Sequence, residues 1–307
     1  MPKIAVTSNS FSQHPILRRE LCELFPDVRL NETGKRLAGA ELRMHLAGTD
    51  GWIIGLEPVD ADLLAANAQL RIISKYGVGL NNLDLPACEA RGVKIGWSGG
   101  VNKRSVSEMT LGYLLMLSRN LYQSSLLLKQ GIWKKNGGRL LTGKTVGIIG
   151  VGYAGKDLIQ LLQPFGCRIL VNDIIDQSAY YDLHGLREVS KGDLLAQSDF
   201  VSIHTPYNAD TANMIDAAAL ARMQPHAYLL NTARGGIVDE SALKAALQSG
   251  QIAGAAMDVY LEEPPTDLEL LGLPNLICTP HIGGNAEEAV LDMGRSAIRH
   301  LRTFYRV

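Results

Sequence analysis

Three residues suited to proton transfer and anion binding follow apolar stretches in the second half of the sequence: Arg234 in NTARGGIVDE, Glu263 in DVYLEEPP and His281 in LICTPHIGG. Arginine presents a planar fork that can bind a carboxylate and a neighbouring carbonyl oxygen together. Histidine can give a proton to a carbonyl oxygen and take it back near neutral pH, and a glutamate can orient it. Taken singly, each is more often a solvated or structural group.

A glycine-rich turn precedes these residues in TVGIIGVGYAGKDL. Gly150, Gly152 and Gly155 have G-x-G-x-x-G spacing between a strand-like run and a helix-like run that opens with Tyr153 and Ala154. The glycines permit a tight turn, a close approach of backbone to a pyrophosphate, and close packing of helix on strand. Because strand, turn and helix come in the required order, the turn predicts a dinucleotide cofactor.

The next strand-like run, RILVND, ends at Asp173. A carboxylate at this place can accept hydrogen bonds from ribose hydroxyls and would repel a 2′-phosphate, so NAD is favoured over NADP. The alternative is an acid that only caps a turn.

Short β-rich runs alternate with helix-length segments along the chain, which predicts an α/β fold with two doubly wound parallel-sheet domains. The expected strands are KIAV, GWIIG, RIISK, VKIGW, TVGIIG, RILVN, FVSIH, AYLLN, IAGAAMDV and LICTP.

Two helices are expected to begin with capping boxes. Ser105 and Glu108 have capping-box spacing at the start of a helix over about 104–130, which is apolar around most of its circumference. Such a helix lies between two domains, is covered by a second subunit, or both. Asn285 and Glu288 have the same spacing at the start of a final helix.

Composition points to small-molecule partners. The 307 residues are 46% hydrophobic, and 30 Lys and Arg against 31 Asp and Glu leave no broad charge for nucleic acid or a membrane. The N-terminus lacks a signal-peptide pattern, and no apolar run has membrane-spanning length. The four cysteines form no CxxC pair, so no metal site and no disulfide framework are expected, and a cytoplasmic location fits best.

Several longer motifs, in order, resemble the D-isomer-specific 2-hydroxyacid dehydrogenase family over nearly the whole chain. They are KYGVGLNNLDLPACEARGV, NKRSVSEMTLGYLL, GVGYAG, DFVSIHTPYNADTANMI, LLNTARGGIVDESAL, AMDVYLEEPP and TPHIGG. The resemblance implies a flavodoxin-like substrate-binding domain from residues 1–98 and 285–307, with a Rossmann-type NAD-binding domain, 99–284, inserted in it.

The resemblance also implies roles for individual residues. Arg234 would bind the substrate carboxylate and carbonyl, and His281 would be the acid/base with Glu263 as its partner. Glutamate at position 263 speaks against formate as substrate, because formate-oxidising members carry glutamine there. The amides of Val78 and Gly79 would help to hold the substrate carboxylate.

The cofactor site implied by the resemblance extends beyond the glycine turn and Asp173. Asp258 would accept the carboxamide N–H of the nicotinamide, and His204 would shape the site without being the acid/base. The remaining contacts are expected from Thr205, Pro206, Thr211, Thr232, Ala233, Arg234, His281 and Gly283.

Lysines and arginines leave the choice of hydroxy acid open. Lys75 stands beside the substrate loop, and WKKNGGR contributes Lys134, Lys135 and Arg139 in a segment that lies near the partner subunit in family dimers. These charges either bind a second anionic group, as in a phosphoglycerate dehydrogenase-like branch, or are solvated.

Two features speak against that branch. Glu57 lies in the GLEP loop, where those enzymes tend to carry a basic residue, and a chain ending at Val307 is expected to lack the regulatory domain of longer relatives. The leading hypothesis is an NAD-dependent homodimeric dehydrogenase that interconverts a D-2-hydroxy acid and its 2-oxo acid. The alternatives are a dinucleotide-sensing, corepressor-like interaction protein and an oxidoreductase of an unusual substrate such as phosphite.

Overall fold

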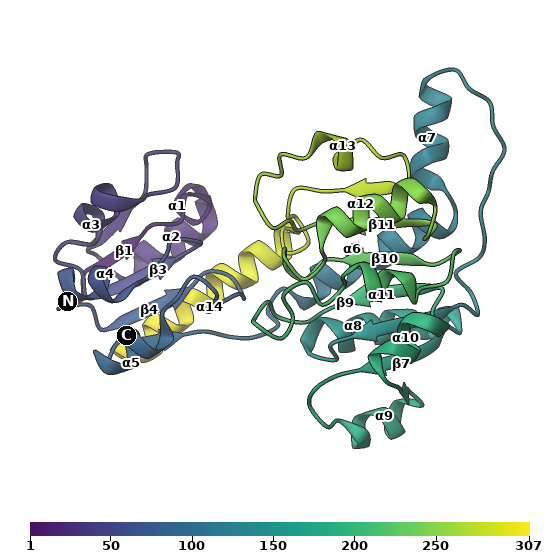
Figure 1. Cartoon of the computed structure of the whole chain (residues 1–307). Coiled ribbons are helices and arrows are strands. Elements are labelled where there is room, and N and C mark those ends of the chain that lie inside the picture. The colour runs from purple at the N-terminus through teal and green to yellow at the C-terminus, as the bar shows by residue number, and fades with distance from the viewer. The chain divides into compact units, whose positions relative to one another are not determined.

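The computed structural model describes residues 1–307 and divides the chain into two compact units (Figure 1). Unit 1 is Met1–Asn102 with Ala286–Val307, and unit 2 is Lys103–Asn285. These limits lie within a few residues of the predicted domain boundaries. Each unit is built on one parallel sheet, so the predicted fold class is confirmed.

Unit 1 has a five-stranded sheet in the flavodoxin-like order β2-β1-β3-β4-β5. Its strands are β1 Ile4–Val6, β2 Val28–Leu30, β3 Gly51–Ile54, β4 Ile72–Lys75 and β5 Lys94–Gly96. Its helices are α1 Asn9–Gln13, α2 Pro15–Leu24, α3 Gly39–Leu46, α4 Ala61–Ala66, α5 Leu85–Ala90 and α14 Glu287–Tyr305.

Helix α14 brings the C-terminal residues back to unit 1. Its Ala297 and Leu301 are fully buried in the same apolar cluster as Ile53 of β3. The Ser74 hydroxyl of β4 donates a hydrogen bond to the Ala297 carbonyl at 2.7 Å. The end of the chain is therefore part of the core of unit 1.

Unit 2 has a seven-stranded sheet in the order β12-β11-β10-β9-β6-β7-β8. Its strands are β6 Thr145–Ile149, β7 Arg168–Asn172, β8 Arg187–Glu188, β9 Phe200–Ile203, β10 Tyr228–Asn231, β11 Gly254–Met257 and β12 Leu276–Cys278. Its helices are α6 Lys103–Ser118, α7 Leu121–Lys129, α8 Tyr153–Leu162, η1 Gln163–Phe165, α9 Ser178–His184, α10 Lys191–Gln197, α11 Ala217–Ala221, α12 Glu240–Ser249 and α13 Leu268–Leu271.

The strand order of unit 2 reverses direction between β6 and β9. Successive strands after β6 run outward through β7 and β8, whereas β9 to β12 run outward on the other side. Open α/β sheets bind ligands beyond the carboxyl ends of the strands at such a reversal. The fold therefore places the glycine turn after β6 beside the loop after β9.

The prediction of one capped helix over about 104–130 is wrong in two respects. The segment forms two helices, α6 and α7, separated at Asn120, whose φ of 51° is left-handed. Asparagine tolerates this conformation better than most residues. Ser105 does not cap α6, because the helix begins at Lys103 and the Ser105 hydroxyl instead donates to the Gly283 carbonyl at 2.6 Å.

Other local predictions also differ from the structure. Strands β2 and β8 were not expected, because both include charged residues and neither is an apolar run. The final helix exists, but Asn285 does not cap it: the N-cap is Ala286, with no side-chain hydrogen bond.

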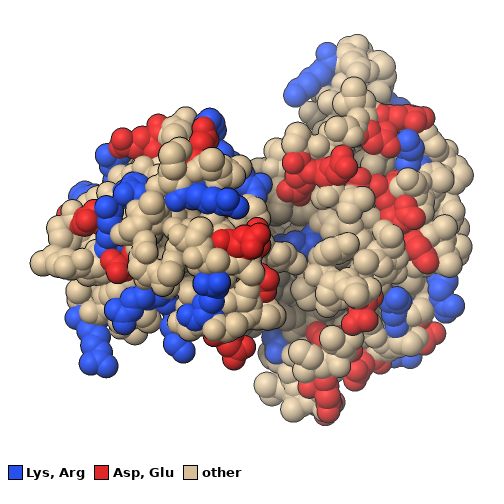
Figure 2. All heavy atoms as spheres, turned by 60° about the vertical axis from the view of Figure 1, so that its left-hand side comes forward, with Lys and Arg blue, Asp and Glu red and all other residues tan.

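Charged side chains of both signs are scattered over the face shown in Figure 2, without a broad region of one sign. No helix combines the length and the apolar character needed to cross a membrane.

Candidate active site

The turn after β6 has the backbone geometry of a phosphate-binding turn. Gly150 has a φ of 92°, and a Cβ there would lie 2.8 Å from the carbonyl of His204, so the two loops at the sheet reversal approach closely. A Cβ at Gly155 would meet the Gly150 oxygen at 2.3 Å, which accounts for the third glycine. Gly152 is the N-cap of α8, has no side-chain cap and faces open space, so the first amides of the helix can receive an anion.

Asp173, directly after β7, is fastened to this turn. Its Oδ2 accepts a hydrogen bond from the Val151 amide at 2.6 Å and one from Gln177 Nε2 at 3.1 Å, and its Oδ1 accepts the Ile175 amide at 3.0 Å. A carboxylate offers about four acceptor positions, so capacity is left for a ribose hydroxyl. The next residue, Ile174, is 98% exposed, which provides an apolar surface beside the carboxylate.

The loop after β9 holds a neutral histidine and a buried hydroxyl. His204 Nε2 lies 2.8 Å from Ser202 Oγ, and burial lowers the pKa of His204 to about 4. The Thr205 hydroxyl is buried and has no hydrogen-bond partner. Thr211 donates to the Pro206 carbonyl at 2.7 Å and so closes the loop. An orphaned hydroxyl at this edge is a group that a ligand can satisfy.

The backbone of the turn after β10 is held by hydrogen bonds that fix the position of Arg234 beyond the end of the strand. The buried Asn231 side chain donates to the Arg234 carbonyl at 2.9 Å and accepts the Ala233 amide at 3.1 Å. A Cβ at Gly235 would lie 1.8 Å from the Tyr260 carbonyl, so only glycine fits. Burial lowers the pKa of the Arg234 guanidinium, while the nearby Glu263 carboxylate raises it.

His281 and Glu263 form an ion-pair geometry at the same sheet edge. His281 Nδ1 lies 2.8 Å from Glu263 Oε2 and 2.9 Å from Oε1. Glu263 Oε1 also accepts the Tyr260 amide at 3.2 Å, which fixes the carboxylate. The His281 side chain is 43% exposed, so its other ring nitrogen can be reached from outside.

Asp258, directly after β11, holds the turn that carries His281. The His281 amide donates to the Asp258 carbonyl at 2.8 Å, and the carboxylate accepts the amides of Ile282 and Gly283, each at 2.8 Å. This matters because His281 has a left-handed φ of 54°, a conformation that costs energy in a non-glycine residue. Only one acceptor position remains on Asp258 for a ligand, since Thr279 also donates to Oδ1.

Thr232, another cofactor contact expected near β10, is buried. Its hydroxyl lies 3.0 Å from that of Thr110 on α6. Sequence reasoning did not identify Thr110, Tyr113 or Thr279. The available signal was the spacing of Ser107, Thr110 and Tyr113, which places three polar side chains on one face of α6.

The expected substrate residues of unit 1 lie around the end of β4. Lys75 is only 3% exposed, and its ammonium donates to the Gly55 carbonyl and to Asn82 Oδ1. Lys75 therefore holds the loop after β3, and direct substrate contact stays a prediction. Val78 and Gly79 are half-buried, and the Val78 carbonyl accepts the Trp97 indole N–H at 2.8 Å.

Glu57 does not act as a charged surface group. It is 2% exposed, and its Oε2 accepts the Gly55 amide at 2.9 Å. The GLEP loop thus places a carboxylate inside unit 1.

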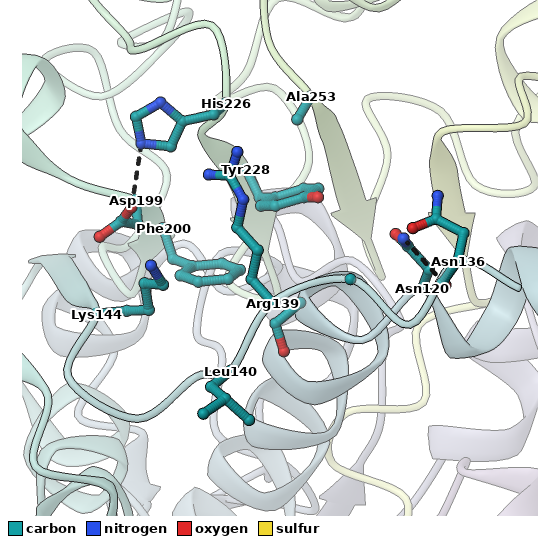
Figure 3. Close-up of a pocket in the computed structure, with 12 residues that line it drawn as sticks. Asn120, Asn136, Arg139, Leu140, Lys144, Asp199, Phe200, His226, Tyr228 and Ala253 are labelled. Carbon is teal, nitrogen blue, oxygen red and sulfur yellow. Dashed lines mark hydrogen bonds and ion pairs between the residues drawn. The ribbon is translucent and has the colours of Figure 1, made fainter.

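Arg139 lies at the opposite edge of the unit 2 sheet from Arg234 and His281. It lines a cavity of about 250 Å³ beside the amino ends of β6, β9, β10 and β11 (Figure 3). The Arg139 amide donates to the Ser118 carbonyl at 2.6 Å, which fastens this segment to the end of α6. Lys134 and Lys135 are exposed and do not line the cavity.

The cavity contains a second histidine and carboxylate pair. His226 Nε2 lies 3.1 Å from Asp199 Oδ1, and Phe200 stacks on Tyr228 with ring centroids 5.2 Å apart. None of the residues predicted for the cofactor or the chemistry lines this cavity. No group of three or more His, Cys, Asp or Glu side chains is arranged to hold a metal ion.

Comparison with known families identifies the fold and its cofactor domain. Residues 111–283 match the NAD-binding domain of the D-isomer specific 2-hydroxyacid dehydrogenases. The chain belongs to this family. A nicotinamide dinucleotide is therefore its cofactor class, and the open helix N-terminus at Gly152 and the orphaned Thr205 hydroxyl fit such a group.

Individual relatives span different lengths. The chain is 39% identical over 233 residues to a D-3-phosphoglycerate dehydrogenase of Mycobacterium leprae, a match covering 75% of this chain and 44% of that one. It therefore spans less than half the length of that relative. It is 34% identical over 271 residues to a hydroxypyruvate reductase of Thermotoga maritima, covering 86% of this chain and 88% of that one. A crystal structure of a Thermus thermophilus protein aligns with a TM-score of 0.87 and 30% identity over 96% of this chain and 94% of that one.

Proposed function

We propose that the protein is an NAD-dependent dehydrogenase that interconverts a D-2-hydroxy acid and its 2-oxo acid. The observation that carries the proposal is the His281–Glu263 pair, held at 2.8 Å beside Arg234, on the sheet edge that also carries the glycine turn. Anion binding, proton transfer and dinucleotide binding are thereby gathered at the carboxyl ends of one parallel sheet.

Arg234 binds and orients the substrate. Its guanidinium can donate two parallel hydrogen bonds, one to a carboxylate oxygen and one to the neighbouring 2-oxo oxygen, as a planar fork allows. Partial burial strengthens this attraction, because less water competes for the charge. In unit 1, the amides of Val78 and Gly79 stay predicted carboxylate donors.

His281 moves the proton. During reduction, the imidazolium gives its Nε2 proton to the carbonyl oxygen as the carbonyl carbon gains a hydride, and the product is the neutral alcohol. During oxidation, the neutral ring takes that proton back. Glu263 holds Nδ1–H, so that Nε2 is the nitrogen presented to the substrate.

A nicotinamide dinucleotide, when bound, would supply the hydride in reduction and accept it in oxidation. The amides that follow Gly152 would hold the pyrophosphate, and Asp173 would accept ribose hydroxyls, which would disfavour a 2′-phosphate and select NAD over NADP. The Thr205 hydroxyl, which has no hydrogen-bond partner, and the remaining acceptor position on Asp258 would bind polar groups of the cofactor.

We further propose a small 2-oxo acid as substrate and a cytoplasmic homodimer as the working form. The Lys75 ammonium is engaged inside unit 1 and Glu57 adds a carboxylate there, which disfavours a phosphorylated substrate. Leu121, Leu126 and Leu128 of α7 are exposed, and burial against a second copy would remove this apolar surface from water. All four cysteines are free, as in a reducing compartment.

A panel of 2-oxo acids tests the proposal. Pyruvate, glyoxylate, hydroxypyruvate, 2-oxoglutarate and phosphohydroxypyruvate are each offered with NADH, whose oxidation is followed at 340 nm. We expect at least one unphosphorylated acid to be reduced, with NADH preferred over NADPH. A folded protein that binds NADH and reduces none of the acids would contradict the proposal.

A further inference from the structure

Helix α6 carries a buried polar stripe that reaches three strand ends of unit 2. Ser107, Thr110 and Tyr113 follow one another at helical spacing, and each is at most 3% exposed. Ser107 Oγ lies 2.8 Å from the Lys103 carbonyl within α6 and 3.1 Å from the Ala154 carbonyl at the glycine turn, and its single proton is shared between these two acceptors. Thr110 meets Thr232 after β10, so the first two contacts of the stripe serve the predicted cofactor site.

The third contact leads to the turn of the acid/base residue. The Tyr113 hydroxyl lies within hydrogen-bond distance of Thr279 Oγ1, and Thr279 Oγ1 donates to Asp258 Oδ1. Because the single hydroxyl proton of Thr279 goes to the carboxylate, its oxygen accepts the proton of Tyr113. Asp258 in turn receives the amides of Ile282 and Gly283.

We propose that Tyr113 and Thr279 are positioning residues that fix the left-handed turn carrying His281 by orienting Asp258. This inference rests on the proposed function for its effect on catalysis, but not for its effect on the turn. Neither residue touches the substrate in this account, and both act through the carboxylate that binds the turn.

The direction of the hydrogen bonds, from Tyr113 to Thr279 and from Thr279 to Asp258, suits this role. Burial raises the pKa of Tyr113 to about 12, so the phenol stays a donor throughout the neutral range. Asp258 is 1% exposed, so water cannot replace a lost donor easily. A rotated Asp258 would release the two amides that hold the turn, and His281 would lose its fixed position relative to Glu263.

Variants that each remove a single hydroxyl group distinguish a role in positioning Asp258 from a role in packing. Thr279→Val keeps the shape of the side chain and is expected to lower kcat about 10-fold, while KM for the 2-oxo acid changes less than about twofold. Thr279→Ser retains the hydroxyl and should restore kcat. Tyr113→Phe should lower kcat about threefold, because Thr279 still reaches Asp258.

The double variant tests whether the two residues form one chain. Tyr113→Phe should have no additional effect once Thr279 is valine, because its partner is already lost. Tyr181→Phe is the matched control: Tyr181 is 2% exposed in the same unit, but its hydroxyl has no hydrogen-bond partner. This control should leave kcat unchanged.

Hydrogen exchange gives a readout that needs no activity. In Thr279→Val the amides of Ile282 and Gly283 should exchange faster, whereas amides of β6 should keep their rates. Unchanged exchange at both amides, or full additivity in the double variant, would overturn the inference. If the unaltered protein reduces no 2-oxo acid but Thr279→Val still speeds exchange, the proposed function fails and the positioning role stands.

Discussion

Unit 2 contains two histidine and carboxylate pairs at opposite edges of one sheet. His281 contacts both Glu263 oxygens through Nδ1, whereas His226 contacts one Asp199 oxygen through Nε2. In each pair the histidine side chain is 43% exposed, and the ring nitrogen lies 2.8 Å from the carboxylate of Glu263 or 3.1 Å from that of Asp199. His281 sits in a left-handed turn held by Asp258, close to the glycine turn and Arg234. His226 lies two residues before β10, and its partner Asp199, directly before β9, also accepts the Thr145 amide at 2.9 Å.

A histidine and carboxylate pair alone therefore does not mark a candidate active site. The carboxyl edge adds a backbone conformation that costs energy, an orphaned hydroxyl and an open helix N-terminus, whereas the amino edge uses its carboxylate to hold the start of β6. Conformational cost that persists at one place in a protein is typical of functional sites.

The largest expected difference is between the two histidines. We predict that His281→Gln lowers kcat by about 1,000-fold, because it removes the proton donor, while NADH affinity stays nearly unchanged. His226→Gln should keep kcat within about twofold. Steady-state kinetics with saturating NADH measures both, and equal losses in the two variants would remove the distinction between the edges.

Substitution of Arg234 should have the next largest effect. Arg234→Lys should lower kcat/KM on the order of 100-fold, since a point charge cannot replace two parallel hydrogen bonds. Arg222→Lys serves as the control, because Arg222 is exposed and donates at 3.4 Å to the Gly192 carbonyl on the surface. A wild-type kcat/KM in Arg234→Lys would show that the substrate is not bound by this side chain.

Cofactor choice should depend on the charge of Asp173. Asp173→Asn keeps the size of the side chain and removes its charge, so the preference for NADH over NADPH should fall about 10-fold. Fluorescence titration with both dinucleotides measures the ratio of the Kd values. A preference for NADPH in the unaltered protein would refute our assignment.

His204 should show the smallest effect, on stability. Its lowered pKa of about 4 means that the unfolded chain takes up a proton below about pH 6.5 while the folded protein does not. The neutral His204 side chain therefore causes no loss of stability above about pH 6.5. As the pH falls from 6.5 toward 4, the free energy of unfolding decreases by at most about 1.4 kcal/mol per pH unit. Urea unfolding of His204→Asn should show a flatter pH dependence, and an unchanged slope would argue against a neutral buried ring.

The fold was predictable where apolar runs mark buried strands. Runs such as TVGIIG and FVSIH became β6 and β9, and the glycine turn between β6 and α8 followed from residue order alone. The edge strand β8 is two charged residues, Arg187 and Glu188, so hydrophobicity could not reveal it. The Ser105 spacing misled because residues three apart recur anywhere along a helix, whether or not one of them caps it.

The position of Arg234, Glu263 and His281 at one edge of the sheet was predictable, whereas the residues that hold them there were not. Arg234, Glu263 and His281 each follow a strand, and parallel strands bring their carboxyl ends to one edge. The hydrogen bonds of Asp258 come from Thr279 and from the turn beyond it, and Tyr113 comes from a distant helix. Such partners depend on tertiary packing, which sequence spacing does not encode.

Transfer of a labelled hydride tests the central claim most directly. The protein is given NADH deuterated at the transferring position of C4 together with the 2-oxo acid that it reduces fastest, and the product is analysed by mass spectrometry and chiral chromatography. We predict a D-2-hydroxy acid carrying one deuterium at C2, formed by the unaltered protein and by His226→Gln but only in traces by His281→Gln. An L-acid, a product without deuterium, or equal product from the two variants would contradict the account.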